Sequence, residues 1–435
     1  AMQHTQSSEY HVENNFNLLS VFEQGKSLSF KSVNKYVSAI ERLGAVNVVD
    51  EDGSVEASFY QRLNLNAFAT YEEIEYKIAV RRWNFAISGS GEGVWRNMKE
   101  YGNFNKFAIT ATPYVQYRSD ALLMSVKVPV KYYKTWYNDT YISPFLYYLR
   151  WDINQKTELQ LNASFGESPV SDKYAFEGYI YTNYRNIIKG SKVEASNKNR
   201  LVDARFSYRD PLALFYVNLS ASYIHYSNGL ISVRDFDGKI IATGFRKGDT
   251  KSESYNASAE ISKDVRAIGG KVGFTANYAV NSGNMVQNNN LFNYKSYSTT
   301  VTGSMNAAIG MWGSLDYSCS YTNLKMKQPG SYVGESSADY IKQSMTFSAT
   351  PLKRLSLDLS ADHYYNSATD TDKNIVLSNL YLQYIVAKKI ELNASVNNIF
   401  NKKSFSNSSI GSLSFYSTIY RLRGREITVG IKYKF

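Results

Sequence analysis

Strict alternation of apolar and polar residues is the sequence feature that most constrains the fold of this chain. Residues 159–165 read LQLNASF, and the same period of two recurs in 355–362 (LSLDLSAD), 390–397 (IELNASVN) and 427–435 (ITVGIKYKF). Successive side chains of a β-strand point to opposite sides, so these runs predict strands with one apolar and one polar face. Similar runs occur at 63–70, 107–117, 124–132, 215–223, 255–262, 272–280, 301–307 and 343–349.

The connections between these runs alternate between short and long. Short connections fall near 119–120, 154–155, 210–211, 309–310, 353–354 and 388–389, and long ones span 89–103, 168–199, 227–251, 282–292, 326–338 and 401–414. Tight turns at one end and long loops at the other are typical of an outer-membrane barrel. We therefore expect an all-β fold, a transmembrane antiparallel up-and-down β-barrel with short periplasmic turns and long extracellular loops.

Counting the runs predicts the size of this barrel. They indicate about 17 strands from residue 57 onward and one more within 27–49, which gives about 17–18 strands in total. We expect an N-terminal arm with one or more possible first strands in 1–56, and the outer-membrane β-barrel in 57–435.

Hydropathy excludes one class of membrane protein and leaves another open. No run of about 18 apolar residues occurs, which excludes a membrane-spanning helix. Barrel strands escape this test because only every second residue is apolar. A large soluble sandwich or β-helix is the alternative, but the Gln, Asn, Ser and Thr on the polar faces suit a water-filled lumen better than a core. The 37 tyrosines fit aromatic girdles at the lipid boundary, and also the high β-propensity of tyrosine.

Two segments depart from the alternating pattern. In 74–87 the apolar residues switch from even to odd positions, which predicts a β-bulge near Arg81-Arg82. Residues 1–26 show no alternation, which predicts an unpaired arm or loop.

The residues that carry enzymatic or metal chemistry are few and scattered. One cysteine excludes a disulfide framework, and four histidines lie far apart in the sequence. His363 follows Asp362, but neighbours on a strand point to opposite faces, so we expect no acid–base pair there. Cys319 falls on the apolar face of its strand. We therefore predict no enzyme activity, no catalytic residues, no metal site and no cofactor.

The C-terminal tract resembles a known family. Residues 397–403 (NNIFNKK), then 420–426 (YRLRGRE), then 427–435 ending in Phe435, resemble the last two strands of a TonB-dependent outer-membrane receptor. Members of that family commonly carry an Asn-(Leu/Ile)-Phe-(Asp/Asn) tract, an Arg-Gly-Arg-type entry to the last strand and a terminal aromatic residue. The specific motifs cover about 40 residues of this chain.

The resemblance implies parts that this chain does not contain. A receptor of this family has a 22-stranded barrel preceded by a plug domain and a TonB-binding segment. Residues 1–56 are too short for a plug, so we identify the chain with the C-terminal barrel portion of a receptor, with the plug absent. The resemblance then implies contact with TonB only through an upstream plug.

Three groups of residues are candidate sites. The aromatic residues of the longest predicted loop are candidates for substrate binding, because exposed rings can stack on sugars or pack on apolar cargo. The apolar positions of the last strand resemble the signal read by the barrel-insertion machinery, and the densest arginine group is a candidate for lipid headgroups. The candidates for substrate binding are Tyr174, Phe176, Tyr179, Tyr181 and Tyr184. The insertion signal comprises Ile431, Tyr433 and Phe435, and the candidates for lipid headgroups are Arg421, Arg423 and Arg425.

The charge balance adds little about partners. Lys plus Arg exceed Asp plus Glu by 49 to 38, but the basic residues are dispersed rather than gathered in a stripe, so we predict no nucleic acid partner. The expected partners are outer-membrane lipid and lipopolysaccharide and the barrel-insertion machinery, with a surface lipoprotein as a further candidate. The expected location is the outer membrane of a Gram-negative-type bacterium.

Three functions are compatible with this pattern. The leading hypothesis is the barrel portion of a TonB-dependent receptor that imports a nutrient such as a metal chelate, glycan or peptide. The alternatives are a plugless porin-like passive channel and a surface-binding or adhesion barrel.

Overall fold

The computed structural model describes residues 2–49, 55–99, 102–135, 139–169, 178–183, 186–190, 196–237, 240–287, 289–328, 335–369, 373–387, 389–410 and 415–433. These residues form strands, apart from short turns and single helical turns such as Glu23–Gly25 and Arg266–Ile268. Within the described ranges, no helix has the length and apolar character needed to cross a membrane.

The strands follow one another along the chain with little else between them. They are β1 (Met2–Phe22), β2 (Lys26–Val49), β3 (Val55–Val80), β4 (Trp83–Met98), β5 (Gly102–Arg118), β6 (Leu122–Lys127), β7 (Val130–Thr135), β8 (Asp139–Ile142), β9 (Phe145–Asn154), β10 (Thr157–Pro169), β11 (Tyr179–Tyr181), β12 (Asn186–Lys189), β13 (Ser196–Asp210), β14 (Phe215–Asp237), β15 (Ile240–Val265), β16 (Gly270–Gln287), β17 (Asn290–Ile309), β18 (Gly313–Lys327), β19 (Glu335–Leu352), β20 (Leu355–Asn366), β21 (Asn374–Ala387), β22 (Ile390–Asn397), β23 (Ser404–Ile410), β24 (Phe415–Arg421) and β25 (Glu426–Tyr433).

One 23-stranded sheet contains every strand except the separate β23–β24 pair. Along its main ladder each strand pairs antiparallel with the next one in the chain. We count β6 and β7 as one interrupted strand, and β8 and β9 as another. The short strands β11 and β12 lie outside the main ladder and are not counted. The described ladder therefore has 19 strands, of which 17 lie from β3 onward. The predicted all-β up-and-down fold and the count of about 17 strands after residue 57 are confirmed.

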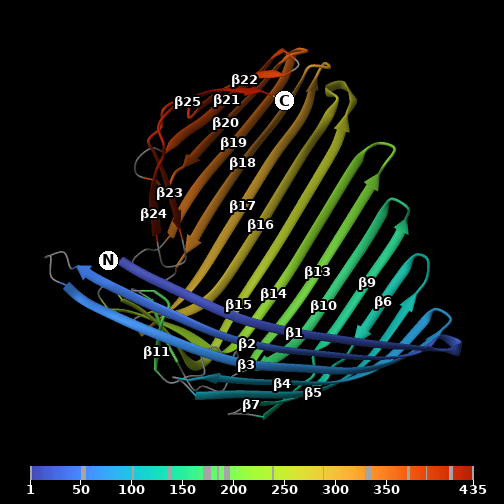
Figure 1. Ribbon diagram of the computed structural model, residues 1–435. Helices are drawn as coiled ribbons and strands as arrows, with labels where there is room; N and C mark the ends of the chain where they lie inside the picture. Colours follow the sequence, from blue (N-terminus) through green and yellow to red (C-terminus); the bar gives the residue numbers. More distant parts are fainter. Residues whose placement is uncertain are drawn as a thin grey trace.

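The sheet curls strongly but has two edges (Figure 1). In the described ranges β1 pairs only with β2, and β25 pairs only with β22. The short turns between consecutive strands gather at one end of the sheet, here called the turn end, and the remaining connections gather at the other, the loop end.

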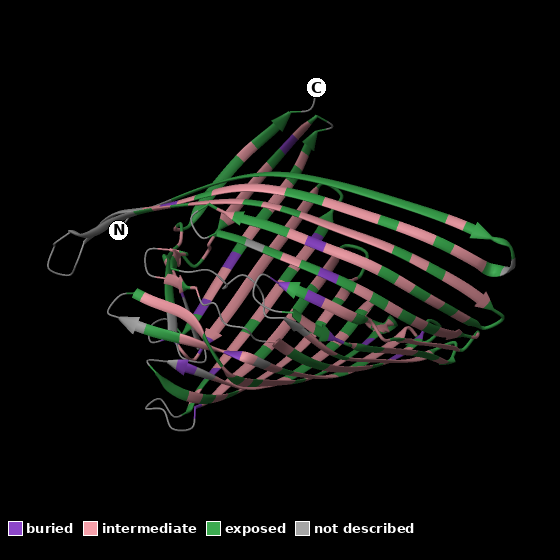
Figure 2. Ribbon diagram, turned by 90° about the horizontal axis from the view of Figure 1, so that it is seen from below, coloured by how far each residue is buried: buried purple, intermediate pink, exposed green. Residues whose placement is uncertain are grey.

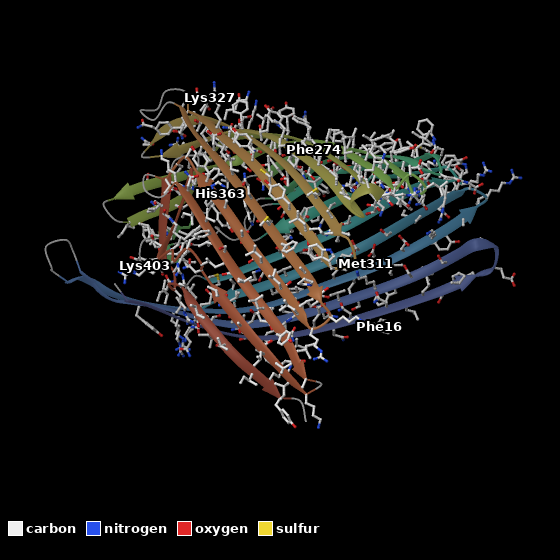
Figure 3. All side chains as sticks on the ribbon, turned by 90° about the horizontal axis from the view of Figure 1, so that it is seen from above. Phe16, Phe274, Met311, Lys327, His363 and Lys403 are labelled. Atoms are coloured by element: carbon white, nitrogen blue, oxygen red, sulfur yellow. The ribbon has the colours of Figure 1, made fainter. Side chains whose placement is uncertain are left out.

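Exposed and half-buried residues alternate along the long strands (Figure 2). Along 83–87 of β4 and 107–115 of β5 the exposed positions are apolar, including Phe85, Ile87, Phe107 and Ile109, whereas the intervening positions are mostly small or polar. The buried apolar cluster recorded for the described residues is small and contains only Ala108, Tyr133 and Ile142. The sheet thus presents an apolar outer face and a polar inner face. Figure 3 shows side chains along the whole sheet, with Phe16 and Phe274 among those labelled.

The N-terminal segment corrects one expectation. Residues 1–26 were predicted to form an unpaired arm or loop, yet Met2–Phe22 is strand β1 and pairs with β2 along its whole length. Its apolar outer positions include Tyr10, Val12, Phe16 and Leu18, all exposed. Asn14 and the inward Leu19 interrupt this pattern, which hides the alternation in the sequence.

The predicted β-bulge near Arg81-Arg82 is also wrong. Val80 pairs directly with Trp83 across a two-residue turn, in which Arg81 has a φ of 54°. Cross-strand partners lie on the same face of a sheet, and a two-residue turn pairs even positions with odd ones. The switch from even to odd apolar positions therefore reflects a hairpin, not a bulge.

Several predicted long connections are extended hairpins instead of loops. β14 and β15 stay paired to Asp237 and Ile240, and β16 and β17 to Gln287 and Asn290. Most of 227–251 and 282–292 is therefore strand. These parts of the hairpins extend past the apolar band of the sheet, so water contacts both of their faces. Their polar composition therefore resembles that of loops.

Glycine at position 270 is required by close backbone packing. A Cβ built on Gly270 would overlap the backbone carbonyl oxygen of Asn306 on the neighbouring strand, whereas one built on Gly303 meets nothing within 4 Å. We expect Gly270→Ala to destabilise the fold by about 1–3 kcal/mol, the usual cost of overpacking. Gly303→Ala, the matched control, should leave stability unchanged or slightly raised. The heat-dependent mobility of the folded band on a denaturing gel would measure this, and equal stability of the two variants would contradict it.

Asp210 organises one connection at the turn end. Its carboxylate accepts hydrogen bonds from Lys156 Nζ at 2.8 Å and from the backbone N–H groups of Leu212 and Ala213 at 3.0 and 3.1 Å. The bond from Lys156, followed by the backbone bonds, lowers the pKa of Asp210 to about 2 from its ordinary 3.8. The charged carboxylate therefore stabilises this turn.

The lowered pKa of Asp210 predicts acid sensitivity of this turn. A depressed pKa contributes stability above the ordinary value of 3.8, and this contribution is lost as the pH falls towards about 2. We expect the amides of Leu212 and Ala213 to exchange hydrogen faster as the pH drops through this window, beyond the intrinsic change in exchange rate. In Asp210→Asn this pH-dependent excess should disappear. A variant that kept the wild-type profile would rule out Asp210 as its source.

Candidate functional site

Two segments leave the main ladder at the loop end. One is the pair β11–β12, here called the strap, and the other is the β23–β24 hairpin. Both lie toward the loop end in Figure 1, where they border the space enclosed by the sheet. We refer to this end of the enclosed space, with the strap and the hairpin, as the mouth.

The strap reaches from one part of the sheet to another. β12 adds in parallel to the loop-end part of β15, through Asn186 to Ile188. On β11, the backbone of Tyr181 makes two hydrogen bonds with the side-chain amide of Gln61 on β3, at 3.1 and 2.8 Å. The Gln61 amide thereby offers the same donor and acceptor pair as a neighbouring strand. This places the strap between β15 and β3, two strands far apart in the ladder.

The corner before the β23–β24 hairpin is built from asparagines. Asn398 and Asn401 both have φ values of 53°, in the left-handed region that asparagine tolerates better than most residues. The Asn398 amide nitrogen donates to the carbonyl oxygens of Lys402 at 2.6 Å and Arg423 at 2.8 Å, and its Oδ1 accepts from Lys402 N–H at 2.9 Å. One side chain therefore holds together both chain segments that lead into the hairpin.

The arginine-rich segment 421–425 contributes to the same corner. Arg425 donates through Nε to the carbonyl oxygen of Ile399, and its backbone N–H donates to Asn401 Oδ1, both at 2.9 Å. The tract that resembles the receptor family is therefore a structural corner that turns the hairpin away from the line of β22 and β25. Figure 3 labels Lys403 at this corner.

The hairpin docks on the inner face of β19 and β20. Tyr340 Oη donates to the carbonyl oxygen of Ser408 at 3.2 Å, and the Asn366 amide nitrogen donates to the same oxygen at 2.9 Å. The Phe405 and Tyr364 rings pack edge to face, with centroids 5.5 Å apart. These contacts hold β23 against the wall by its backbone edge.

The inner face of β4 to β7 carries a compact ionic group. Glu92 pairs with Lys106 at 3.1 Å and with Lys131 at 3.2 Å, and both ammonium groups lie over the Tyr133 ring, at 5.2 and 4.3 Å from its centroid. Towards the turn end, Arg150 pairs with both Asp152 and Glu158. This last group borders a cavity of about 570 Å³. The charges within each of these two groups are thus paired with one another.

The inner face of β14 to β18 is different in character. Five of its cross-strand hydrogen bonds join small neutral side chains, with distances between 2.6 and 3.3 Å. Two others go from Asn218 to Glu260 and from Asn306 to Asp316. The five neutral pairs are Ser220–Ser258, Ser254–Asn281, Asn256–Ser222, Thr300–Thr322 and Thr302–Ser320. Such self-paired hydroxyls and amides present a hydrated surface without a strong anchor for a single ligand.

The aromatic candidates for substrate binding are only partly described. Tyr179 and Tyr181 lie on the strap, where Tyr179 is half exposed and Lys189 lies over its ring at 6.0 Å. Tyr174, Phe176 and Tyr184 lie outside the described residues. A role of these rings in binding stays a prediction, although the strap does place two of them at the mouth.

The other predicted residues fall at the C-terminal edge of the sheet. Ile431 and Tyr433 are exposed on β25, with 75% and 53% of their surface accessible, and Phe435 lies outside the described residues. Arg421 ends β24, and Arg425 holds the corner described above. Insertion signalling by β25, and headgroup contact by Arg421, Arg423 and Arg425, stay predictions.

His363 and Cys319 both lie on the outer face of the sheet. His363 Nε2 lies 3.2 Å from Asn374 Oδ1, on the face opposite to the inward Asp362. Cys319 pairs across to Gln343 on the apolar side, as the alternation predicted. Within the described ranges, no three His, Cys, Asp or Glu side chains gather in a way that could hold a metal ion.

Sequence patterns did not reveal the contacts that shape the mouth. Gln61, Tyr340, Asn366 and Ser408 belong to segments far apart in the chain, and none of them stands out by type or spacing. A signal existed only for Asn398 and Asn401, as part of the tract that resembles the receptor family.

Comparisons with known proteins concern overall shape. No family model matches the sequence, and no curated protein matches it. Among solved structures, the siderophore receptor PirA from Acinetobacter baumannii is similar over 99% of this chain and 63% of its own, with 10% identity and a TM-score of 0.48. This chain therefore spans less than two thirds of that receptor.

Two further solved structures show a similar relation. The siderophore receptor PirA from Pseudomonas aeruginosa is similar over 97% of this chain and 76% of its own, with 10% identity and a TM-score of 0.36. The ferric-catecholate import receptor Fiu from E. coli K12 is similar over 99% and 80%, with 7% identity and a TM-score of 0.35.

The asparagine corner generates a testable prediction. Asn398→Ala should lose the side-chain bonds and also strain the backbone, since a left-handed φ costs an alanine about 1–2 kcal/mol. Asn398→Gly loses the same bonds without the strain, and Asn398→Asp keeps the acceptor but not the donor. We expect stability to fall in the order wild type, Gly, Ala, with protease cleavage of the hairpin rising in parallel. Equal cleavage of all variants would show that Asn398 does not hold the hairpin.

Proposed function

We propose that this chain is the barrel portion of a TonB-dependent receptor in the outer membrane of a Gram-negative-type bacterium, and that the complete receptor imports a nutrient. The observation that carries this proposal is the asparagine and arginine corner formed by the tract that resembles the family, set on a meandering sheet with an apolar outside. Neither feature depends on the identity of the nutrient.

The outer face supports a membrane location. Large apolar side chains such as Ile87, Ile109 and Phe274 are about half exposed, while few apolar side chains of the described residues are buried. Such a surface is stable against hydrocarbon and unstable against water. β15 has 26 residues. At about 3.3 Å per residue it is far longer than the hydrocarbon layer of about 30 Å is thick, even when tilted. The long hairpins would then project beyond the membrane at the loop end.

The two sheet edges set a condition on this proposal. Unpaired backbone groups in lipid cost several kcal/mol each, so a stable span needs every strand paired on both sides. We therefore expect β1 and β25 to pair in the membrane, either with each other or with further strands.

The mouth supports import over simple diffusion. The strap and the β23–β24 hairpin both border the enclosed space at the loop end, where an incoming solute would first meet the protein. A passive channel is served best by an unobstructed mouth. Metal chelates, glycans and peptides are all compatible with a wall of hydroxyl, amide and paired ionic groups.

Labels on neighbouring positions of β4 test the membrane topology. A fluorophore on Ile87→Cys should be quenched by lipid-borne bromine, and one on Ser88→Cys by an aqueous quencher, because the two side chains point to opposite faces. The Cys319→Ser background removes the native thiol. Aqueous quenching at both positions would reject the membrane barrel.

Crosslinking in the native cell tests the receptor assignment. We expect the native protein in outer-membrane fractions to crosslink to TonB, and nutrient uptake to require TonB. A native protein that conducts ions freely in planar bilayers and never crosslinks to TonB would instead be a passive channel.

A further inference from the structure

The docked hairpin and the inner wall together enclose a small crevice. It has a volume of about 90 Å³ and lies where β23 meets β19 and β20. A water molecule takes about 30 Å³, so this space admits one small chemical group and not a whole solute. Its lining includes Tyr340, Lys342, Tyr364, Asn366, Lys373 and Phe405.

Aromatic rings form one side of this crevice. The Tyr364 and Phe405 rings meet edge to face, with an angle of 81° between their planes. Tyr420 on β24 extends the ring group, with its centroid 6.3 Å from that of Phe405. Tyr420 is half exposed, so the ring group continues from the crevice into the open mouth.

Two ammonium groups supply positive charge. Lys342 Nζ lies over the Tyr364 ring at 5.7 Å, and Lys373, the residue before β21, lines the same space. In the part of the chain that the structure describes, no carboxylate forms an ion pair with Lys342 or Lys373. This sets them apart from Lys106 and Lys131 on the opposite wall, which share Glu92.

The frame of the crevice is rigid. Asn366 is 8% exposed, and its amide is used on both sides: Nδ2 donates to the carbonyl oxygen of Ser408, and Oδ1 accepts from Ala368 N–H. Tyr340 donates to the same Ser408 oxygen. The polar groups of the frame are thus satisfied within the protein, while Lys342 and Lys373 line a space that admits one small chemical group.

From this arrangement we propose that the crevice binds the anionic head group of a solute whose adjoining part is a flat ring. The carboxylate of an aromatic acid has the required chemistry. Its charge meets Lys342 and Lys373, and its ring packs on Phe405 and Tyr364. The proposal rests on the proposed transport function, because it names the class of solute that the mouth selects.

The site also links binding to the hairpin. Phe405 belongs to the hairpin, whereas Lys342, Tyr364 and Lys373 belong to the wall or its adjoining connection. A bound head group therefore contacts both sides of the junction. Occupancy should hold the hairpin against the wall.

Titration of the folded chain in detergent with benzoate tests the proposal. Ligand-observed NMR should show saturable benzoate binding and much weaker binding of benzamide, its neutral counterpart. Inorganic phosphate, which has charge but no ring, should also bind more weakly than benzoate. Lys342→Gln and Lys373→Gln should each raise the Kd for benzoate about two- to fivefold, as expected for partly exposed charge pairs.

Matched variants separate the crevice from general charge effects. Lys295→Gln removes another lysine that lies over a tyrosine ring, here Tyr297 at 5.4 Å, and should leave the Kd unchanged. Lys342→Arg should retain binding, and Phe405→Leu should weaken benzoate more than phosphate. The folded band of each variant on a gel shows that it has kept its fold.

The possible results are decisive in both directions. Equal affinity for benzoate and benzamide, phosphate binding as tight as benzoate, or an unchanged Kd in the Lys342→Gln, Lys373→Gln double variant would overturn the crevice site. Lysine-dependent benzoate binding in a protein that never crosslinks to TonB would support the site and reject the transport function. Uptake that requires TonB, together with benzoate binding that does not depend on the two lysines, would support the transport function and reject the crevice site.

Discussion

The outward placement of apolar side chains is the constraint on which the rest of this structure depends. A soluble protein of this length would bury them in a core, but the buried apolar cluster among the described residues consists of Ala108, Tyr133 and Ile142. The hydrophobic contribution to stability must therefore come from contact with a surrounding apolar medium. In such a medium every backbone N–H and C=O needs a protein partner, which a meander of long antiparallel strands supplies along all but its edges.

Because the described residues bury so few apolar side chains, the inner face is held by polar contacts between neighbouring strands. Each such pair contributes only about 0.2–1 kcal/mol, so the wall depends on many of them acting together. The two sides of the wall do this differently. Paired charges around Glu92 and Arg150 hold one side, and small hydroxyls and amides hold β14 to β18. Lys342 and Lys373 line the crevice with no carboxylate partner among the described residues, and this is the basis of the crevice site.

The tract that resembles TonB-dependent receptors has a physical role of its own. Asn398 and Asn401 supply left-handed backbone positions, and Asn398 and Arg425 bond the two chain segments that enter the hairpin. The corner redirects the hairpin from the line of the sheet to the inner wall. The same residues that suggest a family thus also explain how the mouth is shaped, without reference to a substrate.

The sequence by itself determined the strand class, the up-and-down order and the two-faced character, because alternation is a local property of a strand and needs no partner to be recognised. The number of strands that it indicated after residue 57 also agrees with the number observed. Where a polar residue sat on the apolar face, as at Asn14 in β1, the local pattern failed, and the long pairing with β2 decided the structure.

Only the tertiary structure decided the turn at Arg81, the extended hairpins and the contacts of the mouth. Register is a relation between two strands, so a two-residue turn and a bulge give the same switch of parity when one strand is read alone. Gln61 meets Tyr181 across 120 residues, and Asn366 meets Ser408 across 42. Such contacts depend on how far the sheet curls and where the corner turns the chain, and no local pattern of residues carries that information.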